Sequence, residues 1–158
     1  MKPNFQRMLA LIDEVFATRR DPEQLQVNEK AIQKLQRMHP ATLSEFADEN
    51  GPAAWILMIP TSGKTMNDFI SGKISEQKIL EETSPGEEYK AIYLCSATVL
   101  PEYRGKGLAM DLSLKAIQKI KKDHPVKALY VWPFTKEGDA LAKKLAEKTW
   151  LELFLKKH

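Results

Sequence analysis

The sequence predicts an α/β protein of the α+β kind, in which helices cover a mixed β-sheet and a helical segment over residues 1–51 comes first. Apolar residues recur at intervals of three and four through that segment, which is typical of amphipathic helices. From position 53 to 158, strand-forming runs alternate with amphipathic helices, a pattern that favours a sheet packed by helices. The length of 158 residues suits one domain, which buries about two-thirds of its unfolded surface.

Three helices are predicted within the first fifty residues. The first covers residues 5–20 and places its apolar side chains on one face. The second begins near Pro22, which suits the first helical position, and ends before the His-Pro pair at 39–40. A short third helix is expected over residues 42–48, with the sequence Asn-Gly-Pro at 50–52 terminating it.

A strand is predicted over residues 53–59, and the segment that follows it imitates half of a phosphate-binding Walker A loop. That segment, residues 60–65, reads Pro-Thr-Ser-Gly-Lys-Thr. The first glycine of such a loop would fall at Met58, and no apolar strand ending in Asp follows to hold magnesium. We therefore expect an ordinary loop that caps a helix over 66–70, followed by another helix that ends near Glu82.

The remaining elements alternate between strand and helix. Strands are expected over 89–99, 127–132 and 150–155, with helices over 108–120 and 135–148 between them. Because a helix of suitable length connects the first two of these strands, they should run parallel. The helix over 108–120 directs its apolar residues inward and its lysines to solvent, as a solvated charged face does.

The junction between strand 89–99 and the next helix carries the clearest chemical signal. Gly105 and Gly107 lack a Cβ, so the chain can bend sharply there and lie against a ligand. The first N–H groups of the following helix have no partner within the helix, and they point outward at its positive end. Arg104 and Lys106 add positive charge. The junction is therefore suited to bind phosphate, although it fits neither the G-x-G-x-x-G nor the P-loop pattern.

The segment Val-Leu-Pro-Glu-Tyr-Arg-Gly-Lys-Gly-Leu-Ala at 99–109 closely resembles the acetyl-CoA motif of the GCN5-related N-acetyltransferases, the GNAT family. That motif reads Arg or Gln, two residues, Gly, one residue, then Gly or Ala, and here these positions are Arg104, Gly107 and Ala109. The similarity extends over residues 91–120, including the strand before the motif and the helix after it. It implies an acyl-CoA N-acyltransferase-like fold with acetyl-CoA as co-substrate, and a core over 53–158.

The resemblance also implies the cofactor-binding residues. Two strands, those that carry Val99 and Val131, would splay apart to admit pantetheine, and ligands often collect outside the carboxyl ends of parallel strands. The pyrophosphate would rest on the turn at the start of the helix. The residues implied are Ala97, Thr98 and Val99 for pantetheine, and Arg104, Gly105, Lys106, Gly107, Leu108, Ala109 and Met110 for the pyrophosphate.

The catalytic acid and base of the family have no obvious counterparts here. Counting back eleven residues from the motif Arg, where many members keep Glu or His, gives Tyr93, and Cys95 follows on the same side of the strand. Both are candidate catalytic residues, although a tyrosine with an ordinary pKa near 10 is a poor base at neutral pH. The position of the family's frequent Tyr acid aligns with Ala146, which has no proton to give. Glu87 and Glu88 could act through water.

Three function classes remain open on the sequence. The first is an N-acetyltransferase that transfers acetyl directly to a primary amine of a small molecule or peptide. The second is a non-catalytic acyl-CoA-binding sensor or interaction module, which the Tyr93 and Ala146 positions favour. The third is a nucleic-acid binder, but the net charge, from 24 Lys and Arg against 21 Asp and Glu, is only +3.

Composition bounds the setting of the protein. A single cysteine excludes an internal disulfide and fits a reducing, cytoplasmic compartment. The three histidines lack metal-ligand spacing, so no metal is expected, and the longest apolar run, residues 53–60, is too short to span a bilayer. We expect no nucleic-acid or membrane partner. A homodimer is compatible with the sequence, and the acceptor and acyl chain length stay open.

Overall fold

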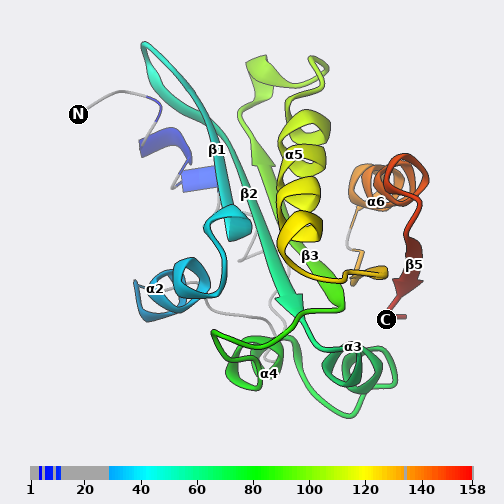
Figure 1. Ribbon diagram of the computed structural model, residues 1–158. Helices are drawn as coiled ribbons and strands as arrows, with labels where there is room; N and C mark the ends of the chain where they lie inside the picture. Colours follow the sequence, from blue (N-terminus) through cyan, green and yellow to red (C-terminus); the bar gives the residue numbers. More distant parts are fainter. Residues whose placement is uncertain (1–3, 5, 9, 12–28, 134, 158) are drawn as a thin grey trace.

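The computed structural model describes residues 4, 6–8, 10–11, 29–133 and 135–157, and within them the chain forms a mixed five-stranded sheet (Figure 1). The strands lie in the order β1-β2-β3-β4-β5. The first two pairings in that order, β1 with β2 and β2 with β3, are antiparallel. The last two, β3 with β4 and β4 with β5, are parallel. The strand bounds are Leu43–Asp48 for β1, Gly51–Thr61 for β2, Ala91–Val99 for β3, Ala128–Val131 for β4 and Glu152–Leu155 for β5.

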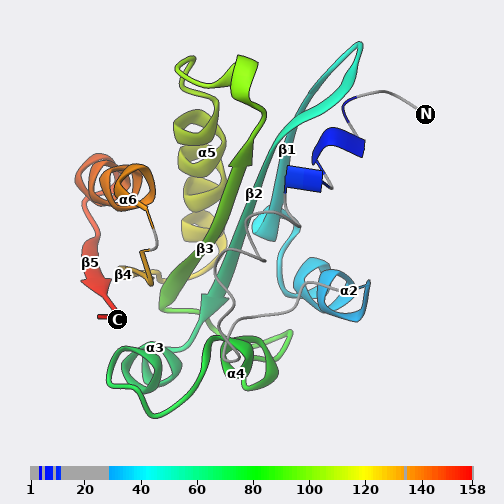
Figure 2. The same cartoon turned by 180° about the vertical axis from the view of Figure 1, so that it is seen from behind.

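Helices pack on both faces of the sheet and give three layers (Figures 1 and 2). The alternation of side chains along β2 explains the layering: Ile56 and Met58 meet α5 and α6, whereas Leu57 and Ile59 meet α2, α3 and α4. The sheet is thus covered on both faces, and its core lies in two apolar clusters. The bounds are Glu29–Met38 for α2, Gly63–Ile70 for α3, Glu76–Glu81 for α4, Leu108–Asp123 for α5 and Lys136–Thr149 for α6.

The prediction of a third helix over residues 42–48 is wrong, because Leu43–Asp48 is strand β1 and only Pro40–Thr42 forms a 3-10 turn, η1. The two residues Glu49 and Asn50 form the turn of a tight hairpin, in which Asp48 lies opposite Gly51, the first residue of β2, which has φ of 108°. Trp55 donates its indole N–H to Glu45 across the two strands at 2.9 Å. Cross-strand pairing therefore outweighs the helical pattern of a segment too short to hold a helix alone.

The N-terminal helices are described only in part. Residue 4, residues 6–8 and residues 10–11 are helical, and Met8 is fully buried against Ala53 and Leu100. The rest of the helix predicted over 5–20 and the predicted start of the next at Pro22 lie outside the described residues. The end of the second helix is confirmed, since α2 stops at Met38 and the His-Pro pair follows.

The predicted elements after residue 53 are found with shifted ends. The strand expected over 127–132 is β4, and it runs parallel to β3 as predicted. The Walker-like segment is an N-cap: the Ser62 hydroxyl accepts a hydrogen bond from the Thr65 N–H at 3.1 Å, and α3 starts at Gly63. The Ser62 side chain therefore serves as the N-cap of α3.

Candidate functional site: the glycine turn and the parting of two strands

The turn between β3 and α5 has the backbone geometry that the two glycines predict. After Leu100, residues 101–103 form a 3-10 turn, η2, and α5 begins at Leu108. Gly105 and Gly107 both have φ of 78°, a left-handed conformation that costs a residue with a side chain about 1–2 kcal/mol. A Cβ built on either glycine would meet no atom within 4 Å, so the space above the turn is open.

The first N–H groups of α5 lie at this turn without a cap. Gly107 is the N-cap residue, and no side chain accepts a hydrogen bond from the first turn of the helix. The earliest helical N–H with a carbonyl partner is that of Asp111, which donates to Gly107 at 2.9 Å. The N–H groups of residues 108–110 therefore have no helical acceptor, and with the positive end of a 16-residue helix they form a site suited to an anion.

Three contacts hold the chain just before the glycines in place. Arg7 of the N-terminal helix binds Glu102, with a distance of 2.6 Å between Nη2 and Oε1. The Tyr103 hydroxyl donates to Asp48 of β1, and the Arg104 Nε donates to the carbonyl oxygen of Val99 at 3.0 Å. The Arg7 guanidinium lowers the pKa of the Glu102 carboxyl to about 2. Residues 102–104 are thus held by the N-terminal helix, by β1 and by the end of β3. The space around Gly105 and Gly107 remains unfilled.

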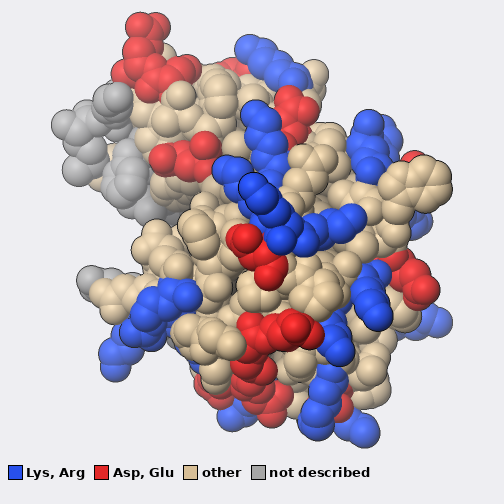
Figure 3. All heavy atoms as spheres, in the orientation of Figure 1, with Lys and Arg blue, Asp and Glu red and all other residues tan. Residues whose placement is uncertain are grey.

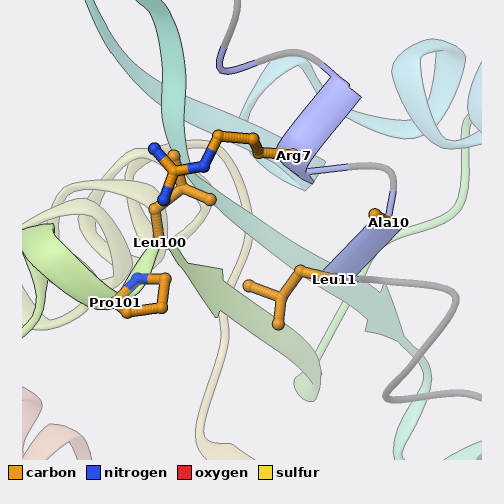
Figure 4. A pocket seen from close by; sticks show the side chains of 5 residues that line it. All are labelled: Arg7, Ala10, Leu11, Leu100 and Pro101. Carbon is orange, nitrogen blue, oxygen red and sulfur yellow. The ribbon is translucent and has the colours of Figure 1, made fainter.

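A hollow of about 250 Å³ lies beside this approach, between the N-terminal helix and the end of β3 (Figure 4). Arg7 and Leu11 border it from the helix, and Leu100 and Pro101 border it from the chain that leads to the turn. Arg7 reaches across the hollow toward Leu100 in this view. The Arg7 guanidinium is already paired with the Glu102 carboxylate, so the charged side chain that borders the hollow is neutralised within the protein.

Strand β3 parts from β4 along its length. Only the first three residues of β3, Ala91–Tyr93, pair with β4, and these are buried. From residue 94 onward the strand keeps its antiparallel pairing with β2 but has no β4 neighbour, and its residues become partly exposed. Ala97 is exposed, and Thr98 and Val99 are half-buried. The main chain of the predicted pantetheine residues therefore belongs to the edge of β3, residues 94–99, that has no partner on the β4 side, and we call this unpaired edge the gap.

Tyr93 and Cys95 lie where the strands part, on the face that α3 and α4 cover. Cys95 is the extra residue of a β-bulge, because Leu94 pairs with Met58 and Ser96 pairs with Leu57. Tyr93 is only 1% exposed and donates its hydroxyl to the Glu76 carboxylate, which is equally buried. Both side chains belong to the same apolar cluster, as the predicted alternation required.

Glu76 does not stand out in the sequence as a candidate residue. It is the first residue of α4, next to the N-cap Ser75, and it lies on the helix face that also buries Ile79 and Leu80. Its spacing of three and four residues from these apolar side chains was the signal that could have placed it inside the protein. A buried carboxylate costs several kcal/mol without polar partners, and Tyr93 provides one of them.

Four aromatic rings pack together in the buried cluster at the start of this gap. The centroid of Phe69 lies 5.2 Å from that of Tyr93, 6.0 Å from that of Tyr130 and 6.0 Å from that of Trp132. Tyr93 and Tyr130 are 5.0 Å apart between centroids, and the Tyr130 hydroxyl is 2.9 Å from the Thr61 hydroxyl. Burial raises the pKa of Tyr130 well above its usual value, so this phenol stays neutral.

The other candidates have structural partners. Glu87 accepts a hydrogen bond from the N–H of Ser84 and closes the turn before β3. Ala146 packs in the apolar cluster between α5 and α6, so it contributes no acid. Among the described residues, no group of three or more His, Cys, Asp or Glu is arranged to hold a metal ion. Tyr93 and Glu76 are therefore the polar side chains best placed for chemistry at the gap.

Basic side chains gather on the face of the molecule that α5 covers (Figure 3). Lys115, Lys119 and Lys122 of α5 are exposed, as their spacing predicted, while the apolar side of the helix is buried against the sheet. Acidic residues lie between the basic ones on the same face. In the part of the chain that the structure describes, no helix has both the length and the apolar character to cross a membrane.

No family model matches the chain in a comparison with known protein families, and no curated protein matches it.

Proposed function

We propose that this protein is an acetyl-CoA-dependent N-acetyltransferase of the GNAT kind, with an acyl-CoA N-acyltransferase-like fold. One observation carries the proposal: three uncapped N–H groups and two left-handed glycines lie at the end of a strand that has just parted from its parallel neighbour. An anion site and a strand gap in this relation suit a ligand that has a diphosphate at one end and an extended arm at the other.

The strands upstream of the turn also favour the proposal. The family usually leads into its motif strand through an antiparallel hairpin, and the sequence predicted only one clear strand there. The structure has two, β1 and β2, and both precede β3 in an antiparallel arrangement. This half of the molecule is therefore closer to the family pattern than the sequence suggested.

The chemistry follows from the position of the gap. The diphosphate of acetyl-CoA rests on residues 104–110, the pantetheine arm lies against residues 97–99, and the thioester reaches the bulge at Cys95. Main-chain N–H groups of β3 on the side of the gap stabilise the oxyanion that forms when an amine attacks the carbonyl, a contribution of about 3 kcal/mol per donor in acyl-transfer sites. Holding both reactants in one geometry lowers the barrier further.

A binding module is the second candidate, and the burial of Tyr93 favours it. A side chain that is 1% exposed and hydrogen-bonded to Glu76 is already satisfied as part of the core. The two candidates share the CoA site and differ in turnover. Purified protein with acetyl-CoA and a panel of primary amines releases free thiol if it is an enzyme. Binding without thiol release over a broad panel identifies the module.

The test of the CoA site is a substitution with a matched control. Gly107→Glu fills the open space at the turn and places a negative charge against the diphosphate, so we expect it to abolish CoA binding in calorimetry. Gly86→Glu is the control, because Gly86 also has positive φ, 90°, and open space around its Cβ, but it lies in the loop before β3. Arg104→Ala should weaken binding less, since the main chain makes most of the contacts.

Equal CoA affinity in the wild type, the Gly107 variant and the Gly86 variant, each shown to be folded by circular dichroism, would remove the CoA site from the turn. A wild-type protein that binds nucleic acid with steep salt dependence and ignores CoA would identify the charged face of α5 as the functional surface instead. We propose a cytoplasmic enzyme that acts on a primary amine of a small molecule or peptide.

A further inference from the structure

The cluster of aromatic rings at the start of the gap already holds a cation of the chain itself. The Lys156 Nζ lies 4.6 Å from the centroid of Phe69 and 5.0 Å from that of Trp132. Lys156 follows β5, and its N–H donates to the carbonyl oxygen of Val131 at 2.9 Å, which places its side chain beside the end of β4. Strand β5, which precedes Lys156, ends near α3 in both views (Figures 1 and 2).

The faces of aromatic rings carry partial negative charge and attract ammonium groups within about 6 Å of the centroid. The rings of Phe69 and Trp132 face the same ammonium group, so together they form a site that favours a cation small enough to contact both rings. Lys156 is half-buried while its neighbour Lys157 is exposed, so only the first of the two lysines is used in this way.

A buried carboxylate lies one ring further in. Phe69 packs edge-on against Tyr93, and the Tyr93 hydroxyl binds Glu76. Negative charge inside the protein attracts a cation at the rings more strongly than it would in water, because the local dielectric constant is lower. The other titratable side chains in this apolar cluster or packed against it, among the described residues, are those of Tyr89, Tyr130, Cys95 and Lys156.

We propose that this aromatic cluster is the acceptor site and that it takes a primary alkylammonium, with Lys156 as a tethered occupant that the acceptor displaces. The inference rests on the proposed function, since it places the acceptor on the sheet face opposite α5, at the point where β3 parts from β4. The diphosphate and the amine then reach the thioester from opposite faces of the sheet. An uncharged or aromatic amine lacks the cation that the rings and Glu76 select.

Two protons leave the nitrogen during the transfer. The bound ammonium first gives one proton to water, which leaves a neutral amine. The amine nitrogen attacks the thioester carbonyl, the C–N bond forms and the C–S bond breaks. The second proton of the nitrogen leaves with the sulfur as free thiol. Glu76 acts through Tyr93 and is a positioning residue.

The binding test does not depend on acetyl-CoA. n-Pentylamine, which is an ammonium ion at neutral pH, and n-pentanol, which has nearly the same shape without the charge, are titrated separately into each variant in a calorimeter. Removal of the tethered competitor in Lys156→Ala should lower the apparent dissociation constant for pentylamine about tenfold relative to wild type. Lys157→Ala is the matched control and should leave it unchanged. Pentanol should bind none of them measurably.

A second pair of variants tests the carboxylate. In the Lys156→Ala background, Glu76→Gln should weaken pentylamine binding about tenfold. If that variant does not fold, Glu76→Met combined with Tyr93→Phe removes the carboxylate together with its hydrogen-bond donor and should weaken binding equally. With acetyl-CoA present, Glu76→Gln should lower kcat/KM for pentylamine and leave that for aniline, which is neutral at pH 7, unchanged. A structural role for Glu76 would reduce both rates equally.

The results separate the two proposals. Failure of CoA to bind the wild type overturns the proposed function, while the pentylamine titration still decides whether the rings take an ammonium. Equal pentylamine affinity in wild type, Lys156→Ala and Lys157→Ala, or equal affinity for pentylamine and pentanol, overturns the acceptor site even if CoA binds.

Discussion

Helix α6 ends on a residue whose conformation is unfavourable for it, and this allows a quantitative test of the structure. Trp150 has φ of 60° and ψ of 30°, the left-handed conformation that helices usually assign to glycine at this position. Its side chain is 94% exposed, so it gains little by burial. The N–H of the next residue, Leu151, donates to the carbonyl of Ala146 at 3.2 Å, which fixes the turn.

The expected gain from Trp150→Gly can be estimated from these values. Relief of the left-handed conformation contributes about 1–2 kcal/mol. Glycine has more conformational freedom in the unfolded chain, which reduces this gain by about 0.4–1 kcal/mol. The Trp150 side chain is 94% exposed, so its removal costs few packing contacts. The free energy of unfolding should therefore rise by about 0.5–1 kcal/mol, with an increase in Tm of about 2–4 °C for each kcal/mol in a domain of this size.

Urea and thermal unfolding followed by circular dichroism measure this change without relying on tryptophan fluorescence. Trp150→Ala is the control, because alanine removes the same ring but keeps a Cβ in the left-handed conformation. It should show no gain. A Trp150→Gly variant that is less stable than wild type, or an alanine variant that gains as much as glycine, would refute the assignment of strain to this residue.

Two further predictions concern the contacts around the site. The Arg7–Glu102 pair stabilises the folded protein above pH 4.5, the ordinary carboxyl pKa, because the pKa of Glu102 falls to about 2 on folding. This stabilisation is lost as the pH drops from 4.5 to 2. Limited pepsin digestion in that range should therefore cut the N-terminal helix of wild type later than that of Glu102→Gln, and identical digestion would contradict the pairing. Ser62→Ala should lower the free energy of unfolding by about 1 kcal/mol, because it removes the N-cap of α3. The control is Lys64→Ala at an exposed position, which should stay within about 0.5 kcal/mol of wild type. Equal midpoints of urea unfolding for the two variants would exclude the cap.

Local chemistry in the sequence was enough for the elements that carry the glycine turn. The apolar spacing of α5, its exposed lysines and the two glycines before it follow from helix periodicity and from the conformations open to glycine, and the structure has them as predicted. The parallel relation of β3 and β4 followed from the length of the helix between them. These features depend on neighbours along the chain, so the sequence determined them.

Tertiary structure decided the elements whose local signal was weak or divided. Residues 43–48 carry a pattern compatible with a short helix, and they form a strand because β2 supplies the backbone partners. The bulge at Cys95 arises from the register between β2 and β3, which no single segment specifies. Long-range hydrogen bonding selects one outcome where local propensity leaves two.

The candidate acceptor site belongs to the same category. Phe69, Glu76, Tyr93, Trp132 and Lys156 come from five separate elements or loops, and each one alone has an ordinary structural explanation. Only the packing of α3 and α4 against the parting strands brings a carboxylate, the rings and an ammonium together. The sequence by itself determined the glycine turn at which we propose that phosphate binds, because adjacent residues build that turn. The fold decided where we propose that the amine binds, since that site requires side chains distant in the chain to share one face of a sheet.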